Sequence, residues 1–218
     1  MGRRKSIYRR RLLDDREMTA TPERPLAIPE GVPATIEVGM GAGRFLAARA
    51  AAEPDRFFVG VELKEERAWQ AIRDARDLGA AANFRAIALP VAEADALLPS
   101  ARFDELIVLF PDPWPKDRYE RRRLISPQHL RLYARWLRPG AIGTFRTDSE
   151  PLFRYAEDVL RSRGFPILRS EANVPPRPTQ TKFEELWRSE RRVIHELAFE
   201  RPALLPDDPL VVADAPSK

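Results

Sequence analysis

Short apolar runs of strand length alternate with longer segments of helical periodicity along the middle of the chain. Runs rich in β-branched and aromatic residues predict strands at 35–39, 56–62, 83–89, 103–110 and 141–147. The segments between and after them predict helices at 44–52, 64–79, 92–98, 126–138 and 151–163. Strands that alternate with helices predict an α/β domain whose mostly parallel sheet is covered on both faces.

The two ends of the chain depart from this alternation. Two further apolar runs, at 164–170 and 191–201, flank a proline-rich loop and predict an antiparallel hairpin that completes a seven-stranded sheet. The first 33 residues are basic and contain four prolines, which favours an extended arm over a long helix. We therefore expect an N-terminal arm (1–33), one domain (34–201) and a flexible tail (202–218).

The composition argues against several classes of function. The chain has 218 residues, no cysteine and two histidines, His129 and His195. Disulfide scaffolds, thiolate metal sites and cysteine nucleophiles are excluded, and a zinc site or a Ser-His-Asp triad is disfavoured. No apolar stretch approaches the roughly 18 residues of a membrane span. We expect a cytoplasmic protein with no metal and no membrane association.

The basic residues are almost all arginines. Five of the 37 basic residues are lysines, which leaves 32 arginines, and the formal net charge is +4. Arginine binds phosphate in a bidentate manner and stacks on bases, so a nucleic-acid partner fits this composition. The coding habit of a GC-rich genome explains it equally well.

The first predicted strand ends in a glycine-rich loop with three glycines at alternate positions: Gly39, Gly41 and Gly43. A dinucleotide-binding fingerprint needs a glycine where Arg44 stands, so an NAD site is disfavoured. Glu37 opens the loop, and Glu62 ends the second strand 19 residues after Gly43, which suits a carboxylate that accepts both ribose hydroxyls. Each feature alone is also compatible with an ordinary strand-to-helix turn, but together they favour a nucleoside cofactor.

The fourth predicted strand ends in the rigid sequence FPDPWPK, residues 110–116. Its three prolines fix the backbone around Asp112 and Trp114, a carboxylate and an aromatic ring that together could hold a nucleobase. A basic run suited to RNA phosphates follows, with Arg118, Arg121, Arg122 and Arg123. A purely structural loop and a solvated helix start are the alternatives.

The pattern E-x-G-x-G-x-G at Glu37 to Gly43 resembles the first motif of class I S-adenosylmethionine-dependent methyltransferases. With Val61-Glu62, FPDPWPKDRYERRRL at 110–124, Thr147-Asp148 and TKFE at 181–184, the chain resembles the bacterial tRNA (guanine-N7-)-methyltransferase family. The matching residues spread over 36–200. The resemblance implies a Rossmann-like class I methyltransferase fold and methylation of guanine 46 in the tRNA variable loop.

The resemblance also implies a role for each matching residue. S-adenosylmethionine, released as S-adenosylhomocysteine, would be bound by Glu37, Gly39, Gly41, Gly43, Glu62 and Asp112. Asp112 would also be the active-site carboxylate between cofactor and base. Substrate contacts are implied for Lys116, Asp148, Thr181, Lys182, Phe183 and Glu184. RNA contacts are implied for Arg118, Arg121, Arg122 and Arg123. The partner would be tRNA, and the protein would be a monomer or a homodimer.

Two positions depart from the family pattern. The family has an acidic residue near the adenine after the third strand, where this chain reads Ala88-Leu89-Pro90-Val91. Either a backbone group replaces it or the register shifts toward Glu93. A glycine common in the family after TKFE is Arg191 here.

Other roles and functions remain open at this stage. Asp148 precedes a predicted helix, so an N-cap role competes with substrate contact. Competing functions are methylation of an exocyclic amine on nucleic acid, nonenzymatic RNA binding on a degenerate methyltransferase fold, and NAD-dependent oxidoreduction. Guanine N7 carries a lone pair and no proton, so its methylation needs positioning more than a general base.

Overall fold

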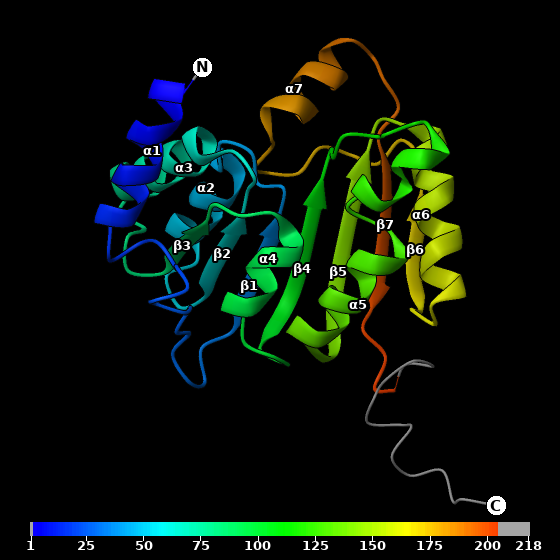
Figure 1. Cartoon of the computed structure of the whole chain (residues 1–218). Helices are drawn as coiled ribbons and strands as arrows, with labels where there is room; N and C mark the ends of the chain where they lie inside the picture. Colours follow the sequence, from blue (N-terminus) through cyan, green and yellow to red (C-terminus); the bar gives the residue numbers. More distant parts are fainter. Residues whose placement is uncertain (1, 205–218) are drawn as a thin grey trace, which may run out of the picture.

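The computed structural model describes residues 2–204, within which seven strands form one sheet (Figure 1). The strands are β1 (Ala34–Val38), β2 (Phe57–Val61), β3 (Phe84–Ile87), β4 (Phe103–Leu109), β5 (Leu137–Thr147), β6 (Ile167–Glu171) and β7 (His195–Glu200). Their order is β3-β2-β1-β4-β5-β7-β6. The first five are parallel, and β7 pairs antiparallel with β5 and β6. The predicted α/β sheet and C-terminal hairpin are therefore confirmed.

Helices cover both faces of the sheet (Figure 1). On one face of the sheet, a hydrophobic core joins β2 and β3 to α2 (Arg44–Ala52) and α3 (Glu65–Asp77). The other side carries α4 (Val91–Ala94), α5 (Pro127–Trp136) and α6 (Glu150–Ser162). Short 3-10 turns occur at η1 (Asp95–Leu97) and η2 (Asp117–Arg122), and α7 (Lys182–Ser189) lies above the carboxyl edge of the sheet.

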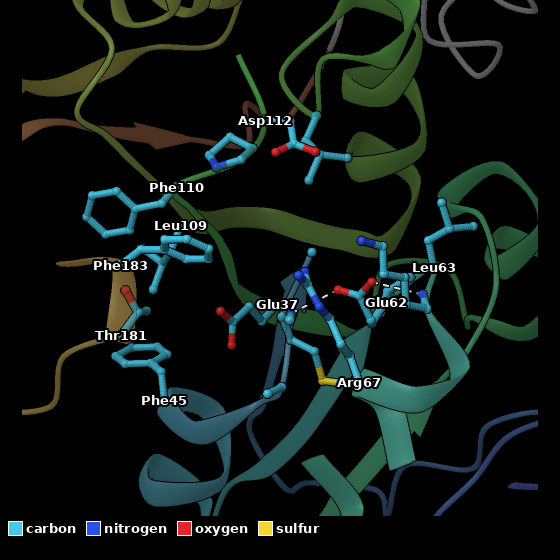
Figure 2. A pocket seen from close by; sticks show the side chains of 18 of the residues that line it. Glu37, Phe45, Glu62, Leu63, Arg67, Leu109, Phe110, Asp112, Thr181 and Phe183 are labelled. Carbon is cyan, nitrogen blue, oxygen red and sulfur yellow. Dashed lines mark hydrogen bonds between the residues drawn. The ribbon is translucent and has the colours of Figure 1, made fainter. Parts of the chain in front are cut away.

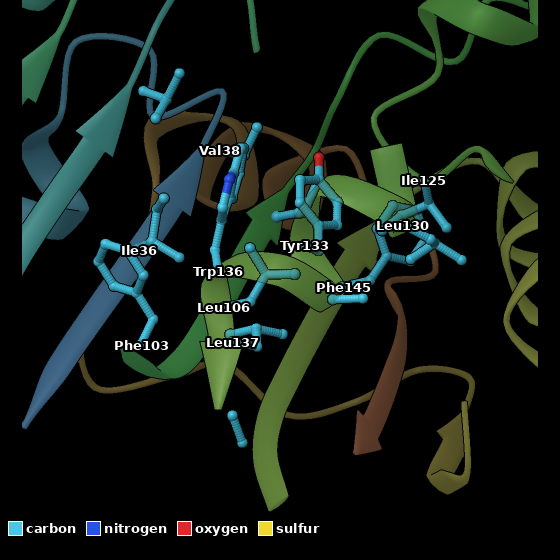
Figure 3. Packing of buried hydrophobic residues seen from close by; sticks show 14 of the residues in the cluster. Ile36, Val38, Phe103, Leu106, Ile125, Leu130, Tyr133, Trp136, Leu137 and Phe145 are labelled. Carbon is cyan, nitrogen blue, oxygen red and sulfur yellow. The ribbon is translucent and has the colours of Figure 1, made fainter. Parts of the chain in front are cut away.

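The larger core packs aromatic and aliphatic side chains of α5 onto the central strands (Figure 3). Tyr133 and Trp136 are 0% and 1% exposed, and their ring centroids lie 5.4 Å apart. Alternate residues of β1, such as Ile36 and Val38, point into the same core. Burying side chains of this size contributes about 1.5–3 kcal/mol each, so this layer fixes α5 on the sheet.

Residues 2–14 form helix α1 (Gly2–Asp14), so the expected extended arm is wrong for this segment. The prolines that suggested an arm all follow the helix, while the segment itself is rich in arginine and leucine, which favour helices. The Arg11 guanidinium lies 5.8 Å from the centroid of the Trp69 ring on α3. After the helix, Met18 O accepts from Ala86 N–H at the edge of β3, at 2.8 Å. The segment thus packs against the domain.

Smaller differences concern element ends. Helix α5 starts at the predicted Ser126 cap, whose Oγ accepts from His129 N–H at 3.4 Å, but it ends at Trp136. Strand β5 begins directly afterwards, so the Pro139-Gly140 pair lies in the irregular first part of a strand. The predicted tail beyond residue 204 lies outside the described residues. Among residues 2–204, no helix is long and apolar enough to cross a membrane.

Candidate active site

A cleft of about 1310 Å³ opens at the carboxyl ends of β1 and β4. The strand order reverses between these two strands, and ligands of open α/β sheets bind at such a reversal. The glycine loop and the end of β2 form one wall, and the 109–114 segment and α7 form the other. The volume exceeds the roughly 300–1,000 Å³ of a typical small-molecule pocket, so the cleft is large for one small ligand.

The glycine loop turns sharply between β1 and α2. Gly39, Gly41 and Gly43 have φ angles of 76°, 59° and 71°, which other residues rarely adopt. A Cβ on Gly43 would lie 2.2 Å from the Cβ of Ala71 on α3, so only glycine fits there. The loop is therefore fixed by the packing of α2 against α3, and its backbone borders the cleft without bulky side chains.

Glu62 is buried at the end of β2, and both of its carboxylate oxygens accept backbone hydrogen bonds. Oε2 accepts from Gly41 N–H at 3.0 Å, and Oε1 accepts from Lys64 N–H at 2.9 Å (Figure 2). A carboxylate has about four acceptor positions, so two remain for a pair of hydroxyl donors in the cleft. Glu62 thus joins the glycine loop to the position expected for a ribose.

Glu37 is a buried carboxylate that points into the cleft (Figure 2). Glu37 is 2% exposed, and its Oε2 atom has no hydrogen-bond partner among the described residues. Burial raises its pKa from the ordinary 4.5 to about 8, although the nearby charges of Arg177 and Arg49 act in the opposite direction. A buried carboxylate without a partner is costly, so the site fits a cationic ligand group.

Asp112 lines the cleft on a loop with a strained backbone. Phe110 and Trp114 have φ angles of 48° and 43°, which are unfavourable for bulky residues. Arg123 holds this conformation: its Nε donates to Trp114 O at 3.1 Å, and its guanidinium lies 4.2 Å from the Tyr155 ring centroid. Strain of this kind clusters at functional sites because the surrounding structure must maintain it.

The four arginines predicted to contact RNA fall into two groups. Three are exposed: Arg118, Arg121 and Arg122. Arg122 lies 4.9 Å from the Trp114 ring centroid and 4.8 Å from that of Tyr119, and together with Arg121 it lines the cleft. Arg123 is 8% exposed and faces the protein. Lys116 is exposed but does not line the cleft.

The TKFE segment starts helix α7, which is not among the helices predicted from the sequence. Three of its residues line the cleft: Thr181, Lys182 and Phe183. The Thr181 Oγ1 caps the helix by accepting from Glu184 N–H at 3.0 Å. Glu184 is 1% exposed, does not line the cleft, and forms ion pairs of 2.7 Å with Arg146 on β5 and with Arg188. It therefore anchors α7 to the sheet.

Asp148 lines the cleft at the end of β5. The alternative that it caps the next helix is wrong, because Ser149 Oγ accepts from Leu152 N–H at 3.3 Å and is the N-cap of α6. The Asp148 carboxylate instead pairs with Arg192 at 2.8 Å. Asp148 is therefore an ion-paired residue of the cleft, and its contact with a substrate stays a prediction.

Several cleft residues carried no sequence signal. Trp187 and Arg192 line the cleft although no motif marked them. Arg177 does not line it, but its charge acts on Glu37 from the proline-rich loop. Where the family has an acidic residue near the adenine, the wall is formed by Leu89, Pro90 and Val91, and Glu93 is not part of it. Only the tertiary structure identifies these residues, because no short sequence motif contains them.

Comparison with known proteins agrees with this geometry. Residues 32–197 match a family described as "Putative methyltransferase". The 16S rRNA methyltransferase KamB has a TM-score of 0.59 at 18% identity, over 83% of this chain and 97% of that one. A 16S rRNA (adenine(1408)-N(1))-methyltransferase variant from Catenulisporales acidiphilia, solved with cosubstrate SAM, has a TM-score of 0.58 at 20% identity, over 81% and 88%. The fold and the cleft define a class I methyltransferase.

Curated relatives narrow this class. The tRNA (guanine-N(7)-)-methyltransferase of Roseobacter denitrificans is 33% identical over 82% of this chain and 79% of its own length. That of Thermus thermophilus is 34% identical over 77% of this chain and 53% of its own length. The matches therefore span about half to four fifths of these relatives. The chain belongs to the tRNA (guanine-N(7)-)-methyltransferase family, which confirms the resemblance stated from the sequence.

Proposed function

We propose that this protein transfers the methyl group of S-adenosylmethionine to N7 of a guanine in tRNA, at position 46 of the variable loop. The observation that carries the proposal is the buried, unpartnered Glu37 carboxylate, which lies in the same cleft as Asp112. A cofactor with an ammonium group gives Glu37 the cation that it lacks, and Asp112 faces the space left for a base. A tRNA substrate also implies action in the cytoplasm.

The residues of one cleft wall hold the cofactor in this proposal. Glu37 pairs with its cationic end, Glu62 accepts its ribose hydroxyls, and the glycine loop lies against its chain. Leu89, Pro90 and Val91 provide an apolar surface for the adenine in place of an acidic residue. S-Adenosylmethionine supplies a methyl group bound to a positively charged sulfur.

The opposite wall positions the guanine. The N7 lone pair forms the new bond to the methyl carbon while the electron pair of the carbon–sulfur bond returns to sulfur, so no proton has to move. The product guanine is cationic, and a carboxylate at Asp112 that accepts from its Watson–Crick edge stabilises this charge as it develops. Most of the acceleration comes from positioning, which can contribute about 7–11 kcal/mol.

The remaining predicted residues divide between RNA contact and support. Arg118, Arg121, Arg122 and Lys116 are exposed near the Asp112 loop and are assigned to RNA phosphates. Thr181, Lys182, Phe183 and Asp148 are assigned to the substrate side of the cleft. Arg123 and Glu184 are assigned to positioning, because both are buried and hold the Asp112 loop and α7 in place.

The test is methyl transfer from labelled S-adenosylmethionine to an unmodified tRNA transcript, followed by identification of the labelled nucleoside. We expect 7-methylguanosine, and its loss from a transcript with another base at position 46. Asp112→Ala should abolish turnover while cofactor binding persists. Asp158→Ala is the control, since this carboxylate is exposed on α6, does not line the cleft and should leave turnover unchanged.

Other outcomes of the same experiment point elsewhere. If the label is found on an exocyclic amine, the reaction is amine methylation instead of N7 methylation. Cofactor binding without transfer to tRNA would mean a different methyl acceptor. RNA binding without cofactor binding would favour a nonenzymatic RNA-binding protein.

A further inference from the structure

The aromatic surface at the rim of the cleft extends beyond Phe183 to residues that have no role in the function proposed above. Helix α7 buries only Glu184, while Phe183, Leu186 and Trp187 line the cleft instead of joining the core. The rings of Phe183 and Trp187 are stacked, with centroids 6.0 Å apart and planes inclined by 24°. A helix that turns its aromatic side chains toward a cleft presents flat apolar faces to a ligand.

One face of Trp187 is covered by a cation. The Arg192 guanidinium lies 3.8 Å from the Trp187 ring centroid, the shortest cation–ring distance among the described residues. The same guanidinium pairs with Asp148 and Glu190, each at 2.8 Å. Its side chain is 43% exposed, and exposed ion pairs contribute only about 0–1 kcal/mol, so this contact can be exchanged.

The surroundings of this surface favour RNA as its ligand. Lys182, Arg121 and Arg122 line the same cleft and offer positive charge to a phosphate backbone. A guanidinium and a nucleobase are both planar groups that stack on an aromatic face. The position that Arg192 occupies over Trp187 is therefore also one that a base can occupy.

We infer that Trp187 stacks on an unpaired RNA base next to the methylated guanine, and that Arg192 leaves the ring and Asp148 to bind the backbone phosphate of that nucleotide. This inference rests on the proposed RNA substrate. Arg192 exchanges one half-buried and one exposed carboxylate for one phosphate. Trp187 exchanges one planar partner for another, and Asp148 is freed to face the target guanine.

The test combines Trp187→Ala with transcripts that lack one base, at the 5′ or the 3′ neighbour of the target guanine. With intact tRNA, Trp187→Ala should weaken binding about tenfold or more, the usual effect of losing one stacked base, while the cofactor dissociation constant stays unchanged. When the base that stacks on Trp187 is removed, the wild-type protein should bind the transcript as weakly as Trp187→Ala does. The inference would be overturned if Trp187→Ala bound intact tRNA and both abasic transcripts more weakly than the wild type by the same factor.

Two further variants separate stacking from a merely structural role. Trp187→Phe keeps a stacking face and should retain most of the affinity, whereas loss equal to that of Trp187→Ala would contradict stacking. Arg192→Ala should reduce the salt dependence of tRNA binding by about one phosphate contact, and an unchanged slope would overturn its part of the inference. Arg161→Ala, which removes an exposed arginine that pairs with Glu157 on α6, is the control and should change neither quantity.

The same experiments distinguish failure of this inference from failure of the proposed function. If no labelled 7-methylguanosine forms with the wild-type protein, the proposed function fails first. If it forms at an equal rate with Trp187→Ala and wild type on both intact and abasic transcripts, only the inference fails.

Discussion

Replacing Glu37 by glutamine should stabilise the folded protein and remove cofactor binding at the same time. Burial raises the pKa of Glu37 from 4.5 to about 8, so between these values the folded protein keeps a proton that the unfolded chain has lost. Stability from this site is fully present below pH 4.5 and is lost as the pH rises through 8. At about 1.4 kcal/mol per pKa unit, burial of Glu37 lowers the free energy of unfolding by about 3 kcal/mol at pH 7 and about 5 kcal/mol above pH 8.

Glu37→Gln removes this penalty because the amide does not ionise. A buried amide has its own desolvation cost, which offsets about 1 kcal/mol or more of the gain. We therefore expect the free energy of unfolding of the variant to exceed that of the wild type by about 2 kcal/mol at pH 7, and by more at pH 8.5. At pH 5 the two proteins should differ little, or the variant should be slightly less stable.

Urea unfolding at pH 5, 7 and 8.5 without cofactor measures this difference. With S-adenosylmethionine at 100 times its dissociation constant, the wild type should gain about 2.7 kcal/mol and the variant almost nothing. The same dependence on pH in both proteins would refute the reasoning, because it would show that Glu37 does not titrate with a raised pKa.

Glu196→Gln provides a control of opposite sign. Burial raises the pKa of Glu196, but hydrogen bonds and charge from Arg146 and Arg177 outweigh burial and lower it below its usual range. Its ionised form therefore stabilises the fold at neutral pH, and this contribution is lost as the pH falls. Glu196→Gln should destabilise the protein at pH 7 and less so in acid.

Three further variants test the strained backbone at Arg191 and the different placements of Arg123 and Arg122. Arg191 has a φ angle of 58°, so Arg191→Gly should raise the free energy of unfolding by about 1 kcal/mol, and a variant of equal or lower stability would argue against strain at this turn. Arg123→Ala should lower stability by about 2 kcal/mol and reduce turnover without changing the salt dependence of RNA binding, because its hydrogen bond to Trp114 is lost. Arg122→Ala should leave the free energy of unfolding unchanged and lower the salt slope of RNA binding by about one. If Arg122→Ala changed stability and Arg123→Ala changed the salt slope, the placement of these arginines would be contradicted.

The sequence by itself determined the parts of this protein that local spacing encodes. Strand-length apolar runs and helical periodicity predicted the parallel sheet and the terminal hairpin, because each element must bury one face. The distances along the chain from Glu37 through the glycines to Glu62 predicted a cofactor site, since strand ends of a parallel sheet meet at one edge. The DPWPK segment marked Asp112 for the same reason.

Local pattern misled where a residue has more than one compatible environment. The N-terminal segment could be arm or helix, and α1 forms because Arg11 and its neighbours pack on α3. The sequence ERRR gives four exposed-looking charges, yet only the fold turns Arg123 inward to Trp114 while Arg122 stays exposed. Charge on a residue does not reveal which face of a turn carries it.

Only the tertiary structure decided which distant residues complete the cleft. Trp187 and Arg192 reach it from α7 and from the segment that follows this helix, and Glu184 is removed from it by ion pairs to Arg146 and Arg188. These contacts depend on how α7 lies over the sheet edge, which long-range packing sets and no short motif encodes. Short motifs along the chain thus indicated the cleft wall formed by Glu37, the glycine loop and Glu62, and long-range packing alone brought Trp187 and Arg192 to the other wall.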